Sequence, residues 1–599
     1  MEKKMEPSSD VRSEHTNQHE IPAKKAKGGL ITMPFIIANE ALEKVGSYGL
    51  LPNMILYMMR DYHLGLPKGT NIIFFWSAAS NFMPILGAFL SDSYLGRFLT
   101  IGFGSIASLL GMILLWLTAM IPKLKPSPCV QFTASCKSPT SSQMTFLVSA
   151  FALISIGAGG IRPCSLAFGA DQLYKRDDPK NERVMESFFS WYYASAAVSV
   201  VIALTGIVYI QDHYGWKVGF GVPVLLMFLA TVLFFLASSL YVKHKASKSL
   251  FTGFAQVIVV AYKNRKLPLP SSNSATGLYH HRKDSDLIAP TAKLRFLNKA
   301  CVIRNREQDI APDGSASNPW NLCTVDQVEE LKALVKVIPL WSTGIMLSIN
   351  TSQGTFLVLQ ASSMDRHITS SSSFQVPAGS YAMFVVISLF FWVALYDRAI
   401  LPLASKIRGK PVRLDVKKRM GIGLFLTSVA MVVSAIVENV RRRRAIHEGF
   451  LNNPQAVVAM SAMWLIPQHC LNGLAEAFTA IGQTEFFYTE FPKSMSSIAA
   501  ALFGLGMAVA NLLASVILSA VDNLTSRGGK SSWVSSEINK ARYDKYYWVL
   551  AIMSFVNLIY FVFCSWAYGP CEQQRKKVRD EPDNRPKELL PKSQDQFPA

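Results

Sequence analysis

Three charged residues lie inside the first long hydrophobic stretch of this 599-residue chain. Glu40, Glu43 and Lys44 interrupt residues 30–59, which otherwise read as a membrane-spanning helix. A charge at the centre of a bilayer helix costs about 2.5 to 3.5 kcal/mol, so such residues normally face a protein interior or a water-filled path. Glu40 and Lys44 are one helical turn apart and can pair. The spacing predicts a proton or ion site; the alternative is an ion pair that only orders helix packing.

Long apolar blocks continue through the chain, which is 50% hydrophobic and only 17% charged. This composition predicts an all-α polytopic membrane protein, because each span needs roughly 20 apolar residues. We place twelve spans, at residues 30–59, 71–91, 99–121, 143–169, 187–210, 217–240, 331–359, 376–402, 420–438, 455–481, 496–521 and 546–567.

The spans divide into two six-helix bundles. We expect a cytoplasmic N-terminal tail at 1–28, an N-terminal bundle at 29–241, a cytoplasmic linker at 242–330, a C-terminal bundle at 331–570 and a cytoplasmic C-terminal tail at 571–599. The linker is rich in Ser, Pro, Lys and Arg, which predicts that it is largely disordered. Two bundles joined by a long central loop are typical of transporters whose substrate binds near the midplane.

Lysine and arginine concentrate in the segments that are cytoplasmic if both termini are inside, and this sets the predicted orientation. The run Arg441 to Arg444 opposes it, since it would lie in an outer loop, and interfacial snorkelling is the only explanation that the sequence offers. No cleaved signal peptide is expected. The plasma membrane is the default location, with the vacuolar membrane as the alternative.

The formal net charge of +20 does not favour nucleic-acid binding, because the basic residues border the spans, where they match anionic lipid. The eight cysteines are scattered without metal-ligand spacing, so no metal or other cofactor is expected. Cys129 and Cys136 share a predicted outer loop and could form a disulfide. No Ser/His/Asp group gathers in a span, so an enzyme is not expected.

Acidic and basic residues recur at the cytoplasmic ends of both halves. Asp92, Gly96 and Arg97 follow the second span, and Asp397 and Arg398 follow the eighth. Such pairs can hold an inner gate closed in one conformation and release it in the other. The alternative is that the basic residues only set the topology.

Five motifs appear in the order found in one transporter family. They are Glu40-Ala-Leu-Glu43-Lys44, Asp92 to Arg97, Gly157 to Gln172, Phe188 to Tyr193 and Ala475-Glu476-Ala-Phe478. With these motifs the chain resembles the proton-coupled nitrate and peptide transporter family of plants, in the major facilitator superfamily, from Gly28 to about Cys571. The long central loop and the absence of two additional spans between the halves resemble the plant branch, and the chain overall resembles its nitrate-type subgroup. The resemblance implies a twelve-span major facilitator fold and symport by alternating access.

The resemblance also implies roles for residues of both halves. Arg162 would pair with Glu40 or Glu43 in one state, and protonation of the carboxylate would free its guanidinium for an anionic substrate. Glu476 would be the partner of Arg162 or Lys44 across the bundles, or merely balance a buried cation. The candidate substrate-binding set is completed by Tyr48, Trp341, Asn350, Thr351 and Gln353. Ordinary packing explains the aromatic positions equally well.

The overall resemblance makes nitrate the first candidate substrate. Some nitrate carriers of the family have a histidine in span seven, whereas here Ser348 to Thr355 contains none, although its amides and hydroxyls can still donate hydrogen bonds. Di- and tripeptides, plant hormones and glucosides are the alternatives. A nitrate sensor that does not transport is the rival from another functional class.

Thr100 lies three residues after Arg97, an arrangement that basic-directed kinases often accept. A phosphate there would add up to about two negative charges beside the gate. This predicts a kinase as a partner. A threonine that caps the helix explains the position equally well.

Overall fold

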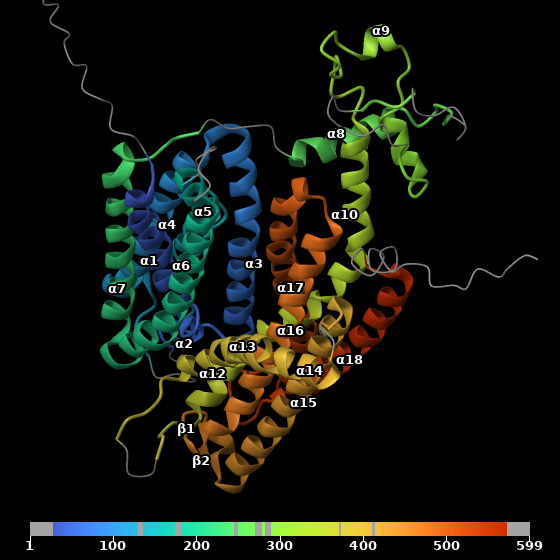
Figure 1. Ribbon diagram of the computed structural model, residues 1–599. Helices are drawn as coiled ribbons and strands as arrows, with labels where there is room; N and C mark the ends of the chain where they lie inside the picture. Colours follow the sequence, from blue (N-terminus) through green and yellow to red (C-terminus); the bar gives the residue numbers. More distant parts are fainter. Residues whose placement is uncertain are drawn as a thin grey trace, which may run out of the picture.

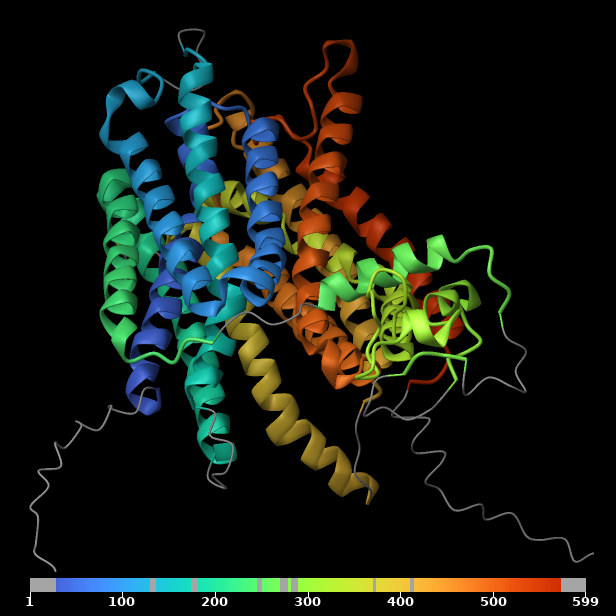
Figure 2. The same cartoon turned by 90° about the horizontal axis from the view of Figure 1, so that it is seen from above.

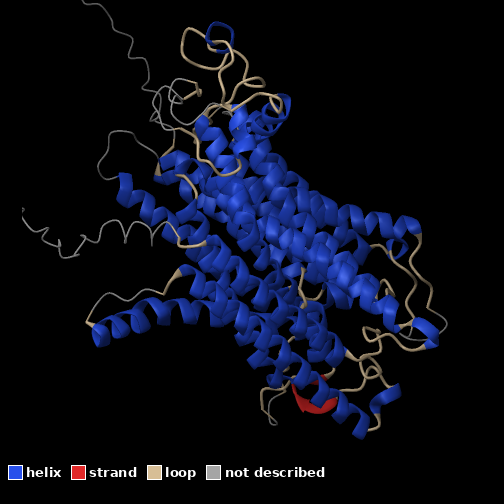
Figure 3. Ribbon diagram, turned by 90° about the vertical axis from the view of Figure 1, so that its right-hand side faces the viewer, coloured by secondary structure: helices blue, strands red, loops and turns tan. Residues whose placement is uncertain are grey.

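The computed structural model describes residues 28–129, 136–173, 181–244, 250–269, 278–281, 289–369, 373–409 and 414–571. Their regular structure is almost entirely helical, with one short pair of strands at an edge of the molecule (Figure 3). The N-terminal helices, blue to green, and the C-terminal helices, yellow to red, form two groups that lie side by side (Figure 1, Figure 2). The chain therefore folds as two helical bundles.

The N-terminal bundle has its helices in the order expected for spans one to six. They are α1 (Met33–Leu50), α2 (Met54–Arg60), α3 (Leu66–Leu90), α4 (Arg97–Met120), α5 (Ser141–Leu173), α6 (Asn181–Ile202) and α7 (Val208–Leu236). Pro52 lies between α1 and α2, so the span predicted at 30–59 is broken there. Proline has no backbone N–H to continue a helix, which explains the break.

A turn at Gly215 separates the fifth and sixth spans. Helix α6 continues through a π-helical turn at Ala203–Ile207 into α7, and the backbone leaves the helical range at Gly215, where φ is 75° and ψ is 177°. Such a positive φ is easily adopted only by glycine. The predicted spans at 187–210 and 217–240 are thus separate passes.

The C-terminal bundle begins with α10 (Val325–Thr343), α11 (Ile345–Thr351) and α12 (Gly354–Ser362), which together form span seven. It continues with α13 (Met383–Leu395), α14 (Leu401–Arg408), α15 (Val416–His447), α16 (Ile466–Glu490), α17 (Ser496–Thr525) and α18 (Tyr543–Tyr568). Gly344 separates α10 from α11, and the side chain of Gln483 lies so close that a Cβ at Gly344 would collide with it.

The tenth span lies further along the chain than the predicted range of 455–481, because α16 begins only at Ile466. The apolar residues before it form strand β2 (Val458–Ser461), which pairs in parallel with β1 (Met364–Asp365). A short apolar run fits a buried strand as well as a helix, so the sequence pattern alone placed this span too early.

Nine helices of the described residues are long and apolar enough to cross a membrane. One of these runs, Arg183–Ser239, contains both passes around Gly215. Helix α1 is not among the nine and carries three charges, and α16 is not among them either and is rich in polar residues. Adding these two helices and the extra pass gives the predicted twelve spans in an all-α fold.

The linker contains folded structure, so the expectation that 242–330 is largely disordered is wrong for its described residues. Helix α8 (Leu250–Lys263) packs against α10 and against a short 3-10 helix at Arg295–Ala300, and α9 (Arg306–Asp309) follows. Figure 1 shows these elements beside the start of α10. They bury a small apolar core that includes Phe254, Val257, Val260, Leu297, Cys301 and Cys323.

Two cysteines make the folding of the linker testable. Cys301 and Cys323 are 0% and 1% exposed, and burial raises the pKa of each thiol to about 12. Because the thiolate is the reactive form, we expect both cysteines to resist maleimide in the native protein and to react after denaturation. Ser317→Cys, at an exposed linker position, is the control. Labelling of native Cys301 as fast as this control would contradict a folded linker.

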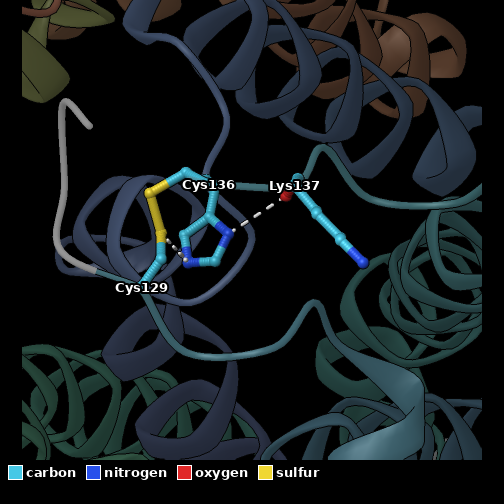
Figure 4. The surroundings of a disulfide bond; sticks show 4 residues. Cys129, Cys136 and Lys137 are labelled. Atoms are coloured by element: carbon cyan, nitrogen blue, oxygen red, sulfur yellow. Dashed lines mark hydrogen bonds between the residues drawn. A yellow bond between two sulfur atoms is a disulfide. The ribbon is translucent and has the colours of Figure 1, made fainter. Parts of the chain in front are cut away.

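The loop between α4 and α5 is closed by a disulfide. Cys129 and Cys136 are bonded, as the sequence suggested, and Figure 4 shows the bond. The ring of His63, which follows α2, lies against it: Nε2 is 3.3 Å from Cys129 Sγ, and Nδ1 is 3.2 Å from the Lys137 carbonyl oxygen. These contacts tie the loop to the end of α2.

Arg441 lies inside the C-terminal bundle, so its predicted place in an outer loop is wrong. Helix α15 continues to His447, and the Arg441 guanidinium donates two hydrogen bonds of 2.8 Å to the Glu438 carboxylate. Both side chains are 0% exposed. Arg441 also donates to Asn539 Oδ1 at 2.9 Å and to the Ile538 carbonyl at 3.2 Å. Buried pairing therefore replaces snorkelling as the explanation of this residue.

The bundles meet differently at the two ends of the molecule. At one end the Gly28 N–H donates to the carbonyl of Leu240, just before the linker, and we call this end the terminus side. The opposite end is called the far side. The hydrogen bonds and ion pairs that join described residues of the two bundles lie on the far side. They connect Asn71 to Ser515 and Ser519, Leu66 to Ser536, and Asp212 to Arg366. The bundles are therefore closed against each other on the far side.

Candidate functional site

One ion pair within α1 and one between α1 and α5 involve four charged residues that the sequence singled out, Glu40, Glu43, Lys44 and Arg162, which we call the acid–base cluster. Lys44 Nζ lies 2.9 Å from Glu40 Oε1, and Arg162 Nη2 lies 3.2 Å from Glu43 Oε1. The glutamate side chains are 3% and 0% exposed, whereas those of Lys44 and Arg162 are 17% and 22% exposed. A solute that reaches this cluster therefore meets the cations before the carboxylates.

Neighbouring side chains hold the two cations in place. Arg162 Nη2 also donates to Ser47 Oγ at 3.0 Å, and its guanidinium lies 5.2 Å from the centre of the Tyr48 ring. Lys44 Nζ lies 5.7 Å from the centre of the Tyr192 ring. Such cation–π contacts attract the cation without neutralising it. Ser47 was not predicted, although its place one turn after Glu43 on α1 could have indicated it.

Close packing of α5 against α4 fixes the position of Arg162. A Cβ on Gly160 would lie 2.6 Å from the Thr100 carbonyl oxygen, and a Cβ on Gly104 would lie 2.9 Å from that of Gly157. Only glycine allows the two helices to approach this closely. The glycine-rich stretch before Arg162 thus sets the distance between its helix and the rest of the bundle.

The ion pairs leave one oxygen of each glutamate unused. Glu40 Oε2, Glu43 Oε2 and Arg162 Nε are buried and have no hydrogen-bond partner among the described residues. Buried polar atoms are normally hydrogen-bonded to protein or water. The two glutamate oxygens therefore mark positions where a proton or a water molecule can bind, and Arg162 Nε can donate a hydrogen bond to water or to an anion.

Glu476 lies on α16 in the other bundle and is not brought into contact with this cluster. Its side chain is partly exposed, and within the described part of the chain no ion pair joins it to Arg162 or Lys44. The predicted pairing across the bundles is thus absent in this conformation. Glu476 is a carboxylate of the C-terminal bundle that is separate from the acid–base cluster.

Asn350 and Gln353 do not face the cluster, and the prediction that they bind substrate is not retained. Both side chains are 1% exposed. The Asn350 amide donates to Thr427 Oγ1 and Ser554 Oγ, and Gln353 accepts a hydrogen bond of 3.0 Å from the Tyr546 hydroxyl. Their polar groups fasten α11 and α12 to other helices of the same bundle.

The remaining predicted lining residues differ in their accessibility. Tyr48 is 39% exposed beside Arg162 and is available to a substrate. The indole of Trp341 donates to the Leu502 carbonyl at 2.8 Å and thereby contacts α17. Thr351 donates to the Ser348 carbonyl of its own helix. Of these three, only Tyr48 contacts the acid–base cluster.

The terminus-side ends of α4 and α5 are joined by a charge group. Arg97 Nη1 lies 2.6 Å from Asp171 Oδ2, and Arg97 Nε lies 4.0 Å from Asp92 Oδ1. Gly96 precedes α4 with a φ of 76°, and a Cβ there would lie 2.9 Å from the His244 carbonyl oxygen, so this position needs glycine. Asp171 lies within the Gly157 to Gln172 motif, but its pairing with Arg97 was not predicted.

Among the described residues of the C-terminal bundle, the corresponding charge group consists of two residues that were not predicted. Arg419 Nη1, in the first turn of α15, lies 2.6 Å from Glu485 Oε2 of α16. Arg398 is exposed in a π-helical turn, and the side chain of Asp397 lies outside the described residues. An arginine at the start of α4 pairs with an acid of α5, and an arginine at the start of α15 pairs with an acid of α16 in the same way. Comparison of the two halves of the sequence could have revealed this repeat.

Thr100 is buried, with 5% of its surface exposed, and its hydroxyl donates to the Gly96 carbonyl at 3.0 Å. A kinase cannot reach this hydroxyl in the present conformation. The position is therefore explained by its role in the first turn of α4, and we do not retain it as a phosphorylation site.

Comparison with known proteins assigns the family. The model of the POT family matches residues 98–534. Protein NRT1/PTR FAMILY 1.2 of Arabidopsis thaliana is 68% identical over 559 residues, which cover 93% of this chain and 92% of that protein. The chain belongs to the POT family. Protein NRT1/PTR FAMILY 1.1 of the same plant is 65% identical and covers 95% of this chain and 96% of its own length.

Solved structures confirm the fold of this POT family transporter. An auto-inhibited POT family peptide transporter superposes with a TM-score of 0.65 at 19% identity, covering 89% of this chain and 96% of that one. A POT family transporter in complex with 5-aminolevulinic acid gives a TM-score of 0.58 at 13% identity, covering 91% and 99%. The all-α major facilitator architecture is thus confirmed, and the chain is a transporter and not an enzyme.

Proposed function

We propose that this chain is a proton-coupled symporter that imports a small anionic solute, nitrate first, by alternating access. The observation that carries the proposal is the pairing of partly exposed Arg162 with fully buried Glu43 at 3.2 Å. A single carboxylate holds the cation, and the second oxygen of that carboxylate has no donor among the described residues. A proton that binds Glu43 and an anion that binds Arg162 would therefore both act on this one ion pair.

In the proposed cycle, Glu43 takes up a proton at its unpaired oxygen. The pair with Arg162 then changes from neutral to a net charge of one, while Lys44 stays paired with Glu40. The freed guanidinium, already the more exposed partner, can donate two parallel hydrogen bonds to a planar anion such as nitrate or a carboxylate. One proton thus accompanies one anion.

Alternating access requires that the bundles separate on one side at a time. Their polar contacts lie on the far side in this conformation, so we infer that the cluster is reached from the terminus side. Asp92, Gly96 and Arg97, with Asp171, are the proposed gating group of the N-terminal half, and Arg419 with Glu485 is that of the other half. Such charge groups can exchange partners between two states.

We further propose that both termini face the cytoplasm and that the membrane is the plasma membrane, with the vacuolar membrane as the alternative. The distribution of lysine and arginine over the predicted loops supports the orientation. With this orientation the far side faces outward, and the conformation described here is open toward the cytoplasm.

A carrier of di- or tripeptides is the second candidate, because Glu476 offers a carboxylate that is separate from the acid–base cluster. A peptide needs a cation for its carboxylate and an acid for its amine, and Arg162 and Glu476 could supply them from opposite bundles. Plant hormones and glucosides are further candidate substrates. A sensor that binds nitrate without transport is the rival class.

The test is a panel of labelled nitrate, dipeptide, gibberellin and glucoside offered to oocytes that express the chain, at about pH 5.5 and about pH 7.5, on either side of the range where a perturbed carboxylate titrates. We expect uptake of labelled nitrate that is severalfold larger at the acid pH. Uninjected oocytes are the control. Acid-stimulated uptake of another solute alone would replace nitrate, and binding without any uptake would establish the sensor.

A further inference from the structure

A groove outside the acid–base cluster opens on the terminus side between the first turn of α15 and the last turns of α18. Its volume is about 470 Å³. Lys417, Lys418 and Asp415 contribute its charged part, and Val562 and Trp566 contribute to its apolar wall. The charged side chains sum to one positive charge. The groove therefore combines a cationic end with an apolar side.

Lys417 offsets the negative end of α18, which would otherwise repel an anion from the groove. Lys417 is 9% exposed, and its ammonium donates to the carbonyl oxygens of Ser565, at 3.1 Å, and of Gly569 at the end of α18. The carbonyl end of a helix carries a partial negative charge that would repel an anion, and a cation bonded to it offsets that charge. Lys418 beside it is exposed to whatever enters the groove.

The apolar wall continues a face of α18 that the protein leaves uncovered. Val562 is 61% exposed and Trp566 is 79% exposed. Ile559 and Phe563, on the same helix, are exposed as well. In a spanning helix such residues meet acyl chains, and tryptophan is enriched at the level of the lipid headgroups. The groove thus lies where the acyl region of a bilayer passes into its headgroup region.

We propose that this groove binds one anionic phospholipid of the terminus-side leaflet. The phosphodiester, with one negative charge, lies at Lys417 and Lys418, and its acyl chains lie along Val562 and Trp566. Basic pockets between spanning helices bind such headgroups in other membrane proteins. A soluble anion would gain nothing from the apolar wall, and an uncharged lipid would gain nothing from the two lysines.

Native mass spectrometry of the purified full chain tests the proposal. The protein is loaded with equal amounts of dioleoyl phosphatidylglycerol and dioleoyl phosphatidylcholine, and the lipid retained after detergent removal is counted. We expect one phosphatidylglycerol to be retained in preference to phosphatidylcholine, and Lys418→Gln to lower its retention about fivefold, as one surface lysine contributes to anionic lipid binding. Trp566→Ala should lower retention as well.

Lys406→Gln is the matched control, because Lys406 is exposed on α14 near the same side but does not line the groove. It should leave retention within twofold of the wild type, as an order-of-magnitude expectation for a charge outside the site. Equal retention of both lipids, or an equal loss in Lys406→Gln, would overturn the proposal. Displacement of the lipid by glycerol 3-phosphate, which has no acyl chains, would also overturn it in favour of a soluble anion.

Discussion

Glu43→Gln is expected to abolish proton-driven accumulation of substrate while leaving the exchange of substrate across the membrane intact. Glutamine has the shape of protonated Glu43 and no charge, so it cannot hold the Arg162 guanidinium as an ion pair. Substrate can then bind without a proton. The proton gradient loses its connection to solute movement, but the empty and loaded carrier can still change conformation.

Proteoliposomes separate these two activities. With an acid exterior, the wild type should accumulate labelled nitrate above the external concentration, whereas Glu43→Gln should not. With unlabelled nitrate inside, uptake of the label by exchange should continue. Glu307→Gln, which changes a glutamate of α9 in the linker, is the matched control and should behave as the wild type. Accumulation by Glu43→Gln at the wild-type level would contradict the role of this carboxylate.

Arg441→Met is expected to have the largest effect on stability, a loss of about 3 to 5 kcal/mol, because it leaves the Glu438 carboxylate buried without its cation. Gln360 Nε2 donates to the same carboxylate at 2.7 Å, and the Tyr547 hydroxyl lies 3.3 Å from Gln360 Oε1. The network joins α12, α15 and α18. Its loss should loosen the C-terminal bundle as a unit.

Thermal unfolding of the purified variants measures this effect. Arg444→Met is the control, since Arg444 is 56% exposed in its pair with Glu448 and should contribute less than about 1 kcal/mol. The double variant Glu438→Gln with Arg441→Met removes both charges and should recover part of the loss. An Arg441→Met melting temperature equal to that of Arg444→Met would show that the buried pair does not support the bundle.

Two parts of the candidate site could be predicted from the sequence, one from the local spacing of charges and one from the family resemblance. Charges at i and i+4 in an apolar stretch predict the Lys44–Glu40 pair, because both residues belong to one helix. Arg162 is 119 residues from Glu43, and only the resemblance brought the two together. The open side of the cluster, where the cations are exposed, follows from the packing of several helices and has no local signal.

Other side chains were misplaced because their direction depends on distant partners. Asn350 is polar and lies in span seven, yet its amide bonds to Thr427 and Ser554 and not to the cluster. Arg441 read as an exposed loop residue although Glu438, its ion-pair partner, is only three residues away. The burial of this pair depends on α15 continuing to His447 and on partners such as Asn539, 98 residues away. The folded linker was missed because its charged composition hides the few apolar residues of its core.

The most direct test of proton-linked anion binding is the affinity of the purified protein for nitrate as a function of pH. If Glu43 must bind a proton before Arg162 can bind the anion, the wild-type dissociation constant should fall by up to about tenfold for each unit of acidification. Glu43→Gln should bind nitrate tightly at every pH. The same pH dependence in the wild type and in Glu43→Gln would contradict the proposed coupling.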